Sequence, residues 1–183
     1  ILCFSTPFDE EAVEMLEELG SPFYKIASAD LTDFPLLERV ASTGKPVILS
    51  TGVANIGEIS EAVEVLRKAG TDEIVLLQCT LQYPCDYENA NIRMMLHLKA
   101  TFPEIPVGLS DHTLGIAIPQ AAVALGASVI EKHYTIDKKL PGSPDHHMSV
   151  DPKDLKQMMD SIRAIEKALG GYEKKVVEAE KQA

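Results

Sequence analysis

The sequence has few cysteines and little positive charge. Only three cysteines, Cys3, Cys79 and Cys85, occur in 183 residues. This odd and sparse set argues against a disulfide framework and favours a reducing cytoplasm as the location. The 17 Lys and Arg residues stand against 28 Asp and Glu residues, for a formal net charge of −11, which argues against nucleic acid or an anionic membrane as a general partner. An anionic substrate would therefore need a locally basic site.

Long apolar runs and nucleotide-binding loops are also missing. No run approaches the roughly 20 apolar residues that span a bilayer, and the opening Ile1–Phe4 run is too short for a signal peptide and has no basic flank. No G-x-G-x-x-G motif follows an apolar run and no Walker-type loop occurs, which weakens a dinucleotide-binding interpretation. The composition, 45% hydrophobic and 25% charged, is typical of a soluble globular protein with a sizeable core.

What is present is an alternation of apolar runs and helical patterns. The predicted strands are Ile1–Thr6, Phe23–Ser28, Pro46–Thr51, Ile74–Thr80, Pro106–Ser110 and Val129–Thr135. The predicted helices are one capped by Asp9 and ended by Gly20, then Phe34–Ala41, Ile56–Ala69, Ile92–Ala100, Ile116–Leu125 and Pro152–Leu169. The strands are continuous apolar runs, which indicates a parallel sheet buried on both faces. We predict an α/β fold over residues 1–171, about six β/α units of a TIM (β/α)8 barrel, and a charged extension or linker over residues 172–183.

Polar residues end every predicted strand, and two of them are histidines. In a (β/α) barrel the active site lies on the face formed by these ends, although a single Ser or Thr there could only cap the next helix. His112 and His133 end consecutive strands, and neighbouring strands lie about 4.8 Å apart. The two imidazoles could share one divalent metal, or they could be a hydrogen-bonded pair in a polar barrel mouth. A later loop with Asp145 and His146 could lie over the same mouth, or it could be an ordinary exposed loop.

Lys25 is the unusual residue of the predicted strands, because it interrupts an apolar run. A lysine there is costly unless its ammonium reaches a charge or a polar cavity. It could bind a phosphate or carboxylate, form a Schiff base as an aldolase nucleophile, or extend to solvent. Ser28, Ser50 and Ser110 could supply hydroxyls to the same anion.

Seven motifs occur in an order that resembles the sialic acid synthase (N-acetylneuraminate synthase) family. They are Ser5-Thr6-Pro7-Phe8-Asp9, Lys25-Ile26-Ala27-Ser28, Ile48-Leu49-Ser50-Thr51-Gly52, Gln78-Cys79-Thr80 with Tyr83-Pro84, Gly108-Leu109-Ser110-Asp111-His112, Glu131-Lys132-His133-Tyr134-Thr135, and Pro141-Gly142-Ser143-Pro144-Asp145-His146. The resemblance extends over residues 1–170, and the combination is far more specific than any one motif.

The resemblance implies a cytoplasmic (β/α)8 barrel enzyme that condenses phosphoenolpyruvate with an N-acetylated hexose such as N-acetylmannosamine. The products would be a sialic-acid-type nonulosonic acid and phosphate, and the cofactor a divalent metal, Mn²⁺ or Mg²⁺. By position, His112 and His133 match the metal ligands. The matches to phosphoenolpyruvate contacts are Lys25, Ser50 and Ser110, with Thr6 and Ser28 as further contacts. Asp145 matches a loop carboxylate near metal and sugar, and with Lys25 it forms the expected catalytic pair.

The sequence departs from the family pattern in three ways. Leu81 stands where the family often has Ser or Asn, and the Asp145 loop is one residue longer than the common form. The first run matches the family's third strand, so we expect a fragment with the third to eighth units, inactive on its own, from a protein that is a homodimer at full length. Two alternatives stay open: a Schiff-base aldolase that uses Lys25, and a non-catalytic assembly piece.

Overall fold

The computed structural model describes residues 1–182 and contains one five-stranded parallel sheet. The strands are β1 (Tyr24–Ile26), β2 (Val47–Ser50), β3 (Ile74–Cys79), β4 (Val107–Asp111) and β5 (Ile130–Lys132). They lie in sequential order, β1-β2-β3-β4-β5, and every neighbouring pair is parallel. Sequential parallel order is what a barrel predicts, whereas a doubly wound fold reverses its order within the sheet. The sheet is thus a half-barrel, in agreement with the predicted fold class.

Six α-helices alternate with these strands within residues 1–182. They are α1 (Glu10–Glu18), α2 (Phe34–Ala41), α3 (Ile56–Ala69), α4 (Met94–Thr101), α5 (Ala117–Ala124) and α6 (Pro152–Leu169). Short 3₁₀ turns occupy Ser28–Asp30, Tyr87–Asn89, Pro144–His147 and Glu178–Gln182. Among these residues no helix is both long enough and apolar enough to cross a membrane.

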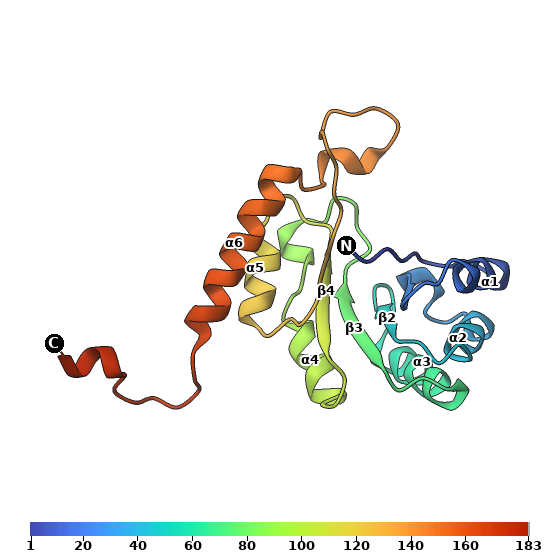
Figure 1. Cartoon of the computed structure of the whole chain (residues 1–183), viewed down its shortest axis with the longest axis horizontal. Coiled ribbons are helices and arrows are strands. Elements are labelled where there is room, and N and C mark those ends of the chain that lie inside the picture. Colours follow the sequence, from blue (N-terminus) through green and yellow to red (C-terminus); the bar gives the residue numbers. More distant parts are fainter. Residues whose placement is uncertain (183) are drawn as a thin grey trace.

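The helices cover one face of the sheet and leave the other more open (Figure 1). Alternate strand residues point to opposite faces, and three residues of the helix-facing set, Tyr24, Leu49 and Leu76, are completely buried. Ile48 and Val75 point to the other face and are only partly buried. The main hydrophobic core therefore lies between sheet and helices, while the second face is free to form a site.

The predicted strand at Ile1–Thr6 is wrong. The structure has no strand there, and Ile1 and Leu2 are fully or largely exposed. A strand gains its stability from ladder hydrogen bonds and from burial of its side chains, and this segment makes neither with β1. Its one aromatic contact is between Phe4 and Phe23, whose ring centroids lie 4.2 Å apart.

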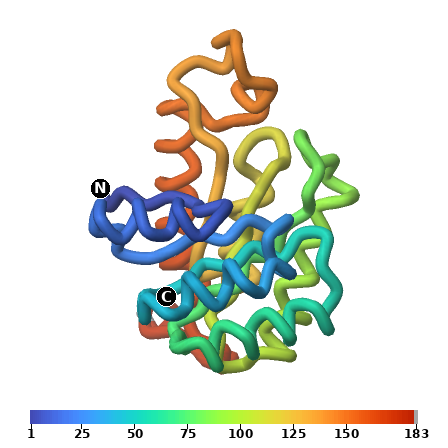
Figure 2. Tube along the Cα trace, turned by 90° about the vertical axis from the view of Figure 1, so that its right-hand side faces the viewer, coloured from blue at the N-terminus to red at the C-terminus, as the bar shows by residue number. Residues whose placement is uncertain are grey.

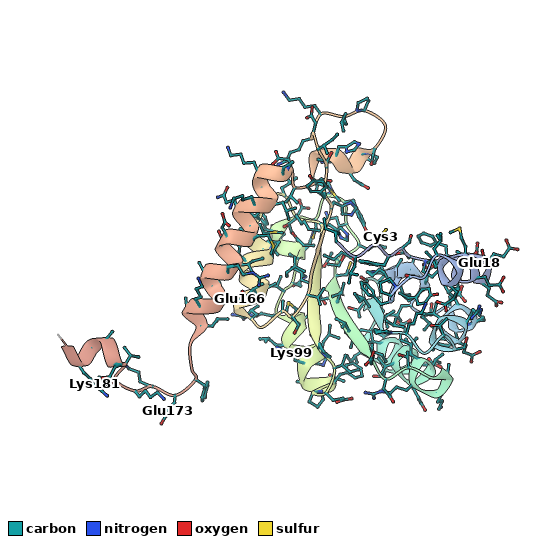
Figure 3. The ribbon with its side chains drawn as sticks, viewed as in Figure 1. Cys3, Glu18, Lys99, Glu166, Glu173 and Lys181 are labelled. Atoms are coloured by element: carbon teal, nitrogen blue, oxygen red, sulfur yellow. The ribbon has the colours of Figure 1, made fainter. Side chains whose placement is uncertain are left out.

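Two segments project from the layered part of the molecule. The loop between β5 and α6 extends beyond the carboxyl ends of the strands, as the ribbon of Figure 1 and the Cα trace of Figure 2 show in orange. The tail after Gly170 runs away from α6, with Glu173 and Lys181 on it (Figure 3). The side chains of residues 171–181 are exposed.

Candidate active site

Strand register brings the polar side chains of several strands onto the open face of the sheet. Ser110 of β4 pairs with Cys79 of β3 on one side and with Glu131 of β5 on the other. Paired residues of parallel strands point to the same face. The same alternation places Lys25 of β1 and Ser50 of β2 on this face. Five neighbouring strands thus direct one polar side chain each into the space that the barrel encloses.

These side chains line a cavity of about 440 Å³ at the carboxyl ends of the strands. Seven of the predicted site residues are among its lining: Thr6, Lys25, Ser28, Ser50, Ser110, His112 and His133. Asp145 does not line the cavity, but its Oδ2 lies 3.8 Å from Nδ1 of His133, which does. The structure therefore brings the predicted residues together in one place.

Lys25 is the cation at the floor of this cavity. Only 6% of the residue is exposed, and its Nζ donates a hydrogen bond to the carbonyl of Ile26 at 2.7 Å. Glu131 Oε2 lies 3.8 Å from Nζ. Burial lowers the pKa of Lys25 below its ordinary value, and the charge of Glu131 acts in the opposite direction. A bound anion would compensate for the burial of this ammonium.

The serine hydroxyls around Lys25 differ in their hydrogen-bond partners. Ser28 Oγ accepts a hydrogen bond from the backbone N–H of Gly52 at 2.9 Å, and Ser110 Oγ donates to Glu131 Oε1 at 2.6 Å. Ser50 Oγ is buried and has no partner among residues 1–182. A buried hydroxyl without a partner is costly unless a ligand or water satisfies it. The cavity thus offers an unused donor close to a buried cation.

The histidine pair lies at the same end of the cavity. The ring centroids of His112 and His133 are 5.3 Å apart, and Tyr83 contacts both rings at centroid distances of 4.0 and 5.7 Å. His112 Nδ1 lies 3.0 Å from the carbonyl oxygen of Thr80. Because a carbonyl oxygen only accepts, Nδ1 carries the proton and leaves the lone pair of Nε2 free.

This arrangement suits a divalent metal. Metal-binding histidines normally donate their second ring N–H to a carbonyl or carboxylate, as His112 does. Burial is the main cause that lowers the pKa of His112 below its ordinary value, which favours the neutral ring that ligation requires. Within residues 1–182 no three His, Cys, Asp or Glu residues are grouped to hold a metal by themselves. His112 and His133 would thus supply two ligands, and water or a bound substrate the remainder.

Comparison with known proteins identifies the family. Residues 1–174 match the family model described as NeuB family. The chain belongs to the NeuB family. It is 48% identical to the N,N'-diacetyllegionaminic acid synthase of Campylobacter jejuni, over 100% of this chain and 54% of that protein. It is 41% identical to the N-acetylneuraminate-9-phosphate synthase of Mus musculus, over 94% of this chain and 47% of that protein.

A solved structure of a similar protein agrees with this assignment to the NeuB family. It is the N-acetylneuraminic acid (sialic acid) synthetase of Leptospira borgpetersenii, crystallised with citrate. The TM-score is 0.93 at 41% identity, and the match covers 100% of this chain and 63% of that one. The chain thus spans about half the length of the curated relatives it matches. The predicted resemblance to sialic acid synthases is confirmed.

Glu131 and Tyr83 line this NeuB-family cavity, and neither was predicted as a site residue from the sequence. The carboxylate of Glu131 contacts both Ser110 and Lys25, and 39% of the Glu131 side chain is exposed. The signal was present, because Glu131 precedes His133 by two residues in the same strand pattern and therefore shares its face. The strand register, which the sequence does not reveal, is what puts it opposite Ser110.

A buried ion pair holds β4 and β5 together on the helix-facing side. Lys132 Nζ donates to Asp111 Oδ2 at 2.6 Å and also to the carbonyl of Thr113. The two charged side chains are 4% and 2% exposed. Lys132 and Glu131 are successive residues of β5 and point to opposite faces of the sheet, and Asp111 and Lys132 also border the cavity that contains Lys25. Because Asp111 and Lys132 directly precede His112 and His133, the pair also fixes the points at which both histidines leave the strands.

His146 and His147 make their contacts within the loop that carries Asp145. His146 Nδ1 lies 2.9 Å from Thr135 Oγ1, and His147 Nδ1 lies 2.5 Å from the carbonyl of Pro144. Neither residue lines the cavity. Of Asp145, His146 and His147, Asp145 is the one with a recorded contact to the histidine pair, through His133.

Proposed function

We propose that the chain supplies the phosphoenolpyruvate and metal sites of an enzyme that condenses phosphoenolpyruvate with an N-acetylated hexose. The observation that carries this proposal is the convergence of Lys25, Ser50 and the pair His112–His133 on one cavity. The names of the relatives support it, because the synthases named above make legionaminic or neuraminic acid derivatives. The hexose is N-acetylmannosamine or a differently substituted analogue.

Lys25 and the hydroxyls would bind the phosphate and carboxylate groups of phosphoenolpyruvate. Charge-assisted hydrogen bonds are about twice as strong as neutral ones, and a largely buried ammonium such as that of Lys25 forms them in a low-dielectric surrounding. Ser50 would gain the partner that it lacks. Thr6, Ser28 and Ser110 line the same cavity and would complete the donor set.

His112 and His133 would hold Mn²⁺ or Mg²⁺ beside the aldehyde of the hexose. A divalent metal in that place supplies Lewis acidity that polarises a carbonyl group. Tyr83 packs on both rings and keeps them in position. Asp145, 3.8 Å from Nδ1 of His133, would orient this ring and accept hydrogen bonds from the sugar hydroxyls.

The reaction balances as follows. The C3 carbon of phosphoenolpyruvate forms a bond to the aldehyde carbon, whose oxygen takes up a proton and becomes a hydroxyl. Water adds at C2 and phosphate departs, which leaves a keto group at C2. The three carbons of phosphoenolpyruvate and the six of the hexose give a nine-carbon 2-keto acid. Lys25 and its serines would keep the reacting enol in place during the attack.

A Schiff-base aldolase is the second candidate, and one observation favours it. Burial lowers the pKa of Lys25, and a neutral amine is the form that attacks a carbonyl. The two candidates differ in covalent chemistry. Borohydride treatment in the presence of pyruvate would leave a stable adduct on Lys25 if the lysine forms a Schiff base, and mass spectrometry of the peptides would locate it. The metal-dependent proposal predicts no adduct.

Phosphoenolpyruvate binding tests the proposal directly. We expect calorimetric titration of the 183-residue chain to show binding, and Lys25→Met to weaken it by roughly 10- to 150-fold, the equivalent of the ~1.5–3 kcal/mol of a hydrogen bond to a charged group. Lys68→Met is the matched control, because the Lys68 side chain is 72% exposed on α3. Equal affinities for the wild type and Lys25→Met would contradict the proposal, as would absence of binding by the wild type.

A further inference from the structure

A second cavity lies on the helix side of the sheet, where the proposed reaction uses no residue. Its volume is about 530 Å³, and it is bounded by residues 51–56, by the end of β3, by the start of α3 and by α4. Cavities that bind small molecules usually enclose 300–1,000 Å³. We call it the helix-side pocket; β3, α3 and α4 mark its position in Figure 1.

The helix-side pocket has no Asp, Glu, Lys or Arg in its lining, as far as residues 1–182 are concerned. This is unusual in a chain with 25% charged residues. Its walls are apolar side chains such as Ile59 and Leu98, with a few polar groups between them and the exposed imidazole of His97 at the edge. The cavity with Lys25 has the opposite chemistry, because Lys25, Glu131 and two histidines line it. A charged ligand would lose its hydration against these apolar walls, and among the lining residues only the exposed imidazole of His97 could carry a charge.

Gln78 directs an amide into this pocket. It lies on the helix-facing side of β3, next to Cys79 in sequence, and only 5% of it is exposed. Within residues 1–182 its amide has one side-chain partner, the thioether sulfur of Met94, 3.8 Å from Nε2. A thioether is a weak acceptor. A buried amide with so little hydrogen bonding is costly unless a ligand or water completes it.

The rim of the pocket contains a strained residue. Val53 has a φ of +55° and is 77% exposed. Positive φ is a genuine outlier for a β-branched residue, and such outliers gather at ligand-binding and switch segments. The same turn reaches the other cavity, because the N–H of Gly52 donates to Ser28 Oγ at 2.9 Å.

The end of β3 connects the two cavities. Thr80 lines the helix-side pocket, and its carbonyl accepts the hydrogen bond of His112 Nδ1 at 3.0 Å. Cys79 and Leu81 line both cavities. A ligand that moves this segment would therefore change the hydrogen bond that orients His112.

We propose that the helix-side pocket binds an uncharged small molecule that carries a carboxamide on an apolar body, and that binding is sensed at His112 through Thr80. The carboxamide would exchange two hydrogen bonds with the Gln78 amide, which offers both a donor and an acceptor. The apolar body would pack against Ile59 and Leu98. The inference rests on this pocket and does not need the proposed synthase reaction.

Benzamide and benzoate are the matched probes, because they share shape and differ in charge. We titrate each into the ¹⁵N-labelled 183-residue chain and record amide and histidine-ring NMR spectra. Benzamide should shift the amides of residues 53–59, 78–81 and 94–98 together with the ring signals of His112. Benzoate should leave the first set unchanged. Equal shifts from both probes, or no shift from benzamide at millimolar concentration, would overturn the proposal.

Gln78→Leu tests the role assigned to the amide. It should weaken benzamide binding by about 2- to 10-fold, the equivalent of one net hydrogen bond, and leave phosphoenolpyruvate binding unchanged. Ser60→Ala on the exposed side of α3 is the control, with unchanged affinity for both. If Gln78→Leu lowers the melting temperature strongly, Met94→Leu, at an exposed position beside the amide, replaces it. Undiminished benzamide binding in Gln78→Leu would refute the assignment.

Discussion

Replacement of Lys132 by methionine should strongly destabilise the fold, because it breaks a buried ion pair. Lys132 and Asp111 form an ion pair whose side chains are 4% and 2% exposed. The substitution leaves the Asp111 carboxylate buried with only the N–H and hydroxyl of Thr113, each at 3.1 Å. Breaking a buried pair in this way typically costs about 3–5 kcal/mol, a large part of the ~5–15 kcal/mol that stabilises a domain.

The assay is urea unfolding, which we expect to show a midpoint lowered by about 2 M, given a slope of ~1–3 kcal/mol per molar urea. Two variants separate pairing from general damage. Lys156→Met makes the same substitution in an exposed pair with Asp160 and should cost less than ~1 kcal/mol. Asp111→Leu combined with Lys132→Met should be more stable than Lys132→Met alone, because no buried charge is left. A Lys132→Met protein that unfolds within ~1 kcal/mol of the wild type would refute the reasoning.

Three further substitutions test the packing and capping arguments. Gly108→Ala should lower the free energy of unfolding by about 1–3 kcal/mol, the usual cost of overpacking a core, because the added Cβ would lie 2.3 Å from the carbonyl oxygen of Val129. Thermal melting checks this, and an unchanged melting temperature would contradict it. Gly52→Ala should weaken phosphoenolpyruvate binding with little loss of stability, because the new Cβ would lie 2.8 Å from Ser28 Oγ; calorimetry and melting together decide between site and fold. Asn55→Ala removes the N-cap of α3 and should cost about 1 kcal/mol in urea unfolding, and a loss below ~0.3 kcal/mol would show that the cap is dispensable.

The helix boundaries were predictable because their signals are local. The predicted bounds of α2, α3 and α6 agree with the structure. Each of these helices begins after an Asp or Asn whose side chain accepts a hydrogen bond from the first turn: Asp33, Asn55 and Asp151. The sequence shows such a cap directly, and no knowledge of the tertiary structure is needed.

The predicted strand Ile1–Thr6 failed because a strand depends on its neighbours. An apolar run of this length predicts a buried strand only if another strand pairs with it. The structure leaves Ile1 and Leu2 exposed and unpaired with β1. Strand pairing is a tertiary property, which periodicity does not reveal.

The sequence predicted several residues of the site but not the alignment of neighbouring strands, which determines the contacts between them. The sequence predicted that Lys25, Ser50 and Ser110 serve one anion at the carboxyl ends of the strands, and all three line the cavity. The contact of Glu131 with Ser110 and Lys25 depends on the alignment of β4 with β5. That alignment is specified by packing across the whole sheet, so Glu131 could not be assigned from the sequence.

Phosphate release by a hybrid synthase tests the central proposal most directly. The hybrid is the Campylobacter jejuni relative in which this chain replaces the matching segment, which is 48% identical over 100% of the chain. It is assayed with Mn²⁺, phosphoenolpyruvate, and both N-acetylmannosamine and the acceptor on which the unmodified relative is active. We predict phosphate release that requires an acceptor and is lost in the Lys25→Met hybrid. A hybrid that melts like the relative and binds phosphoenolpyruvate, yet releases no phosphate, would contradict the proposal.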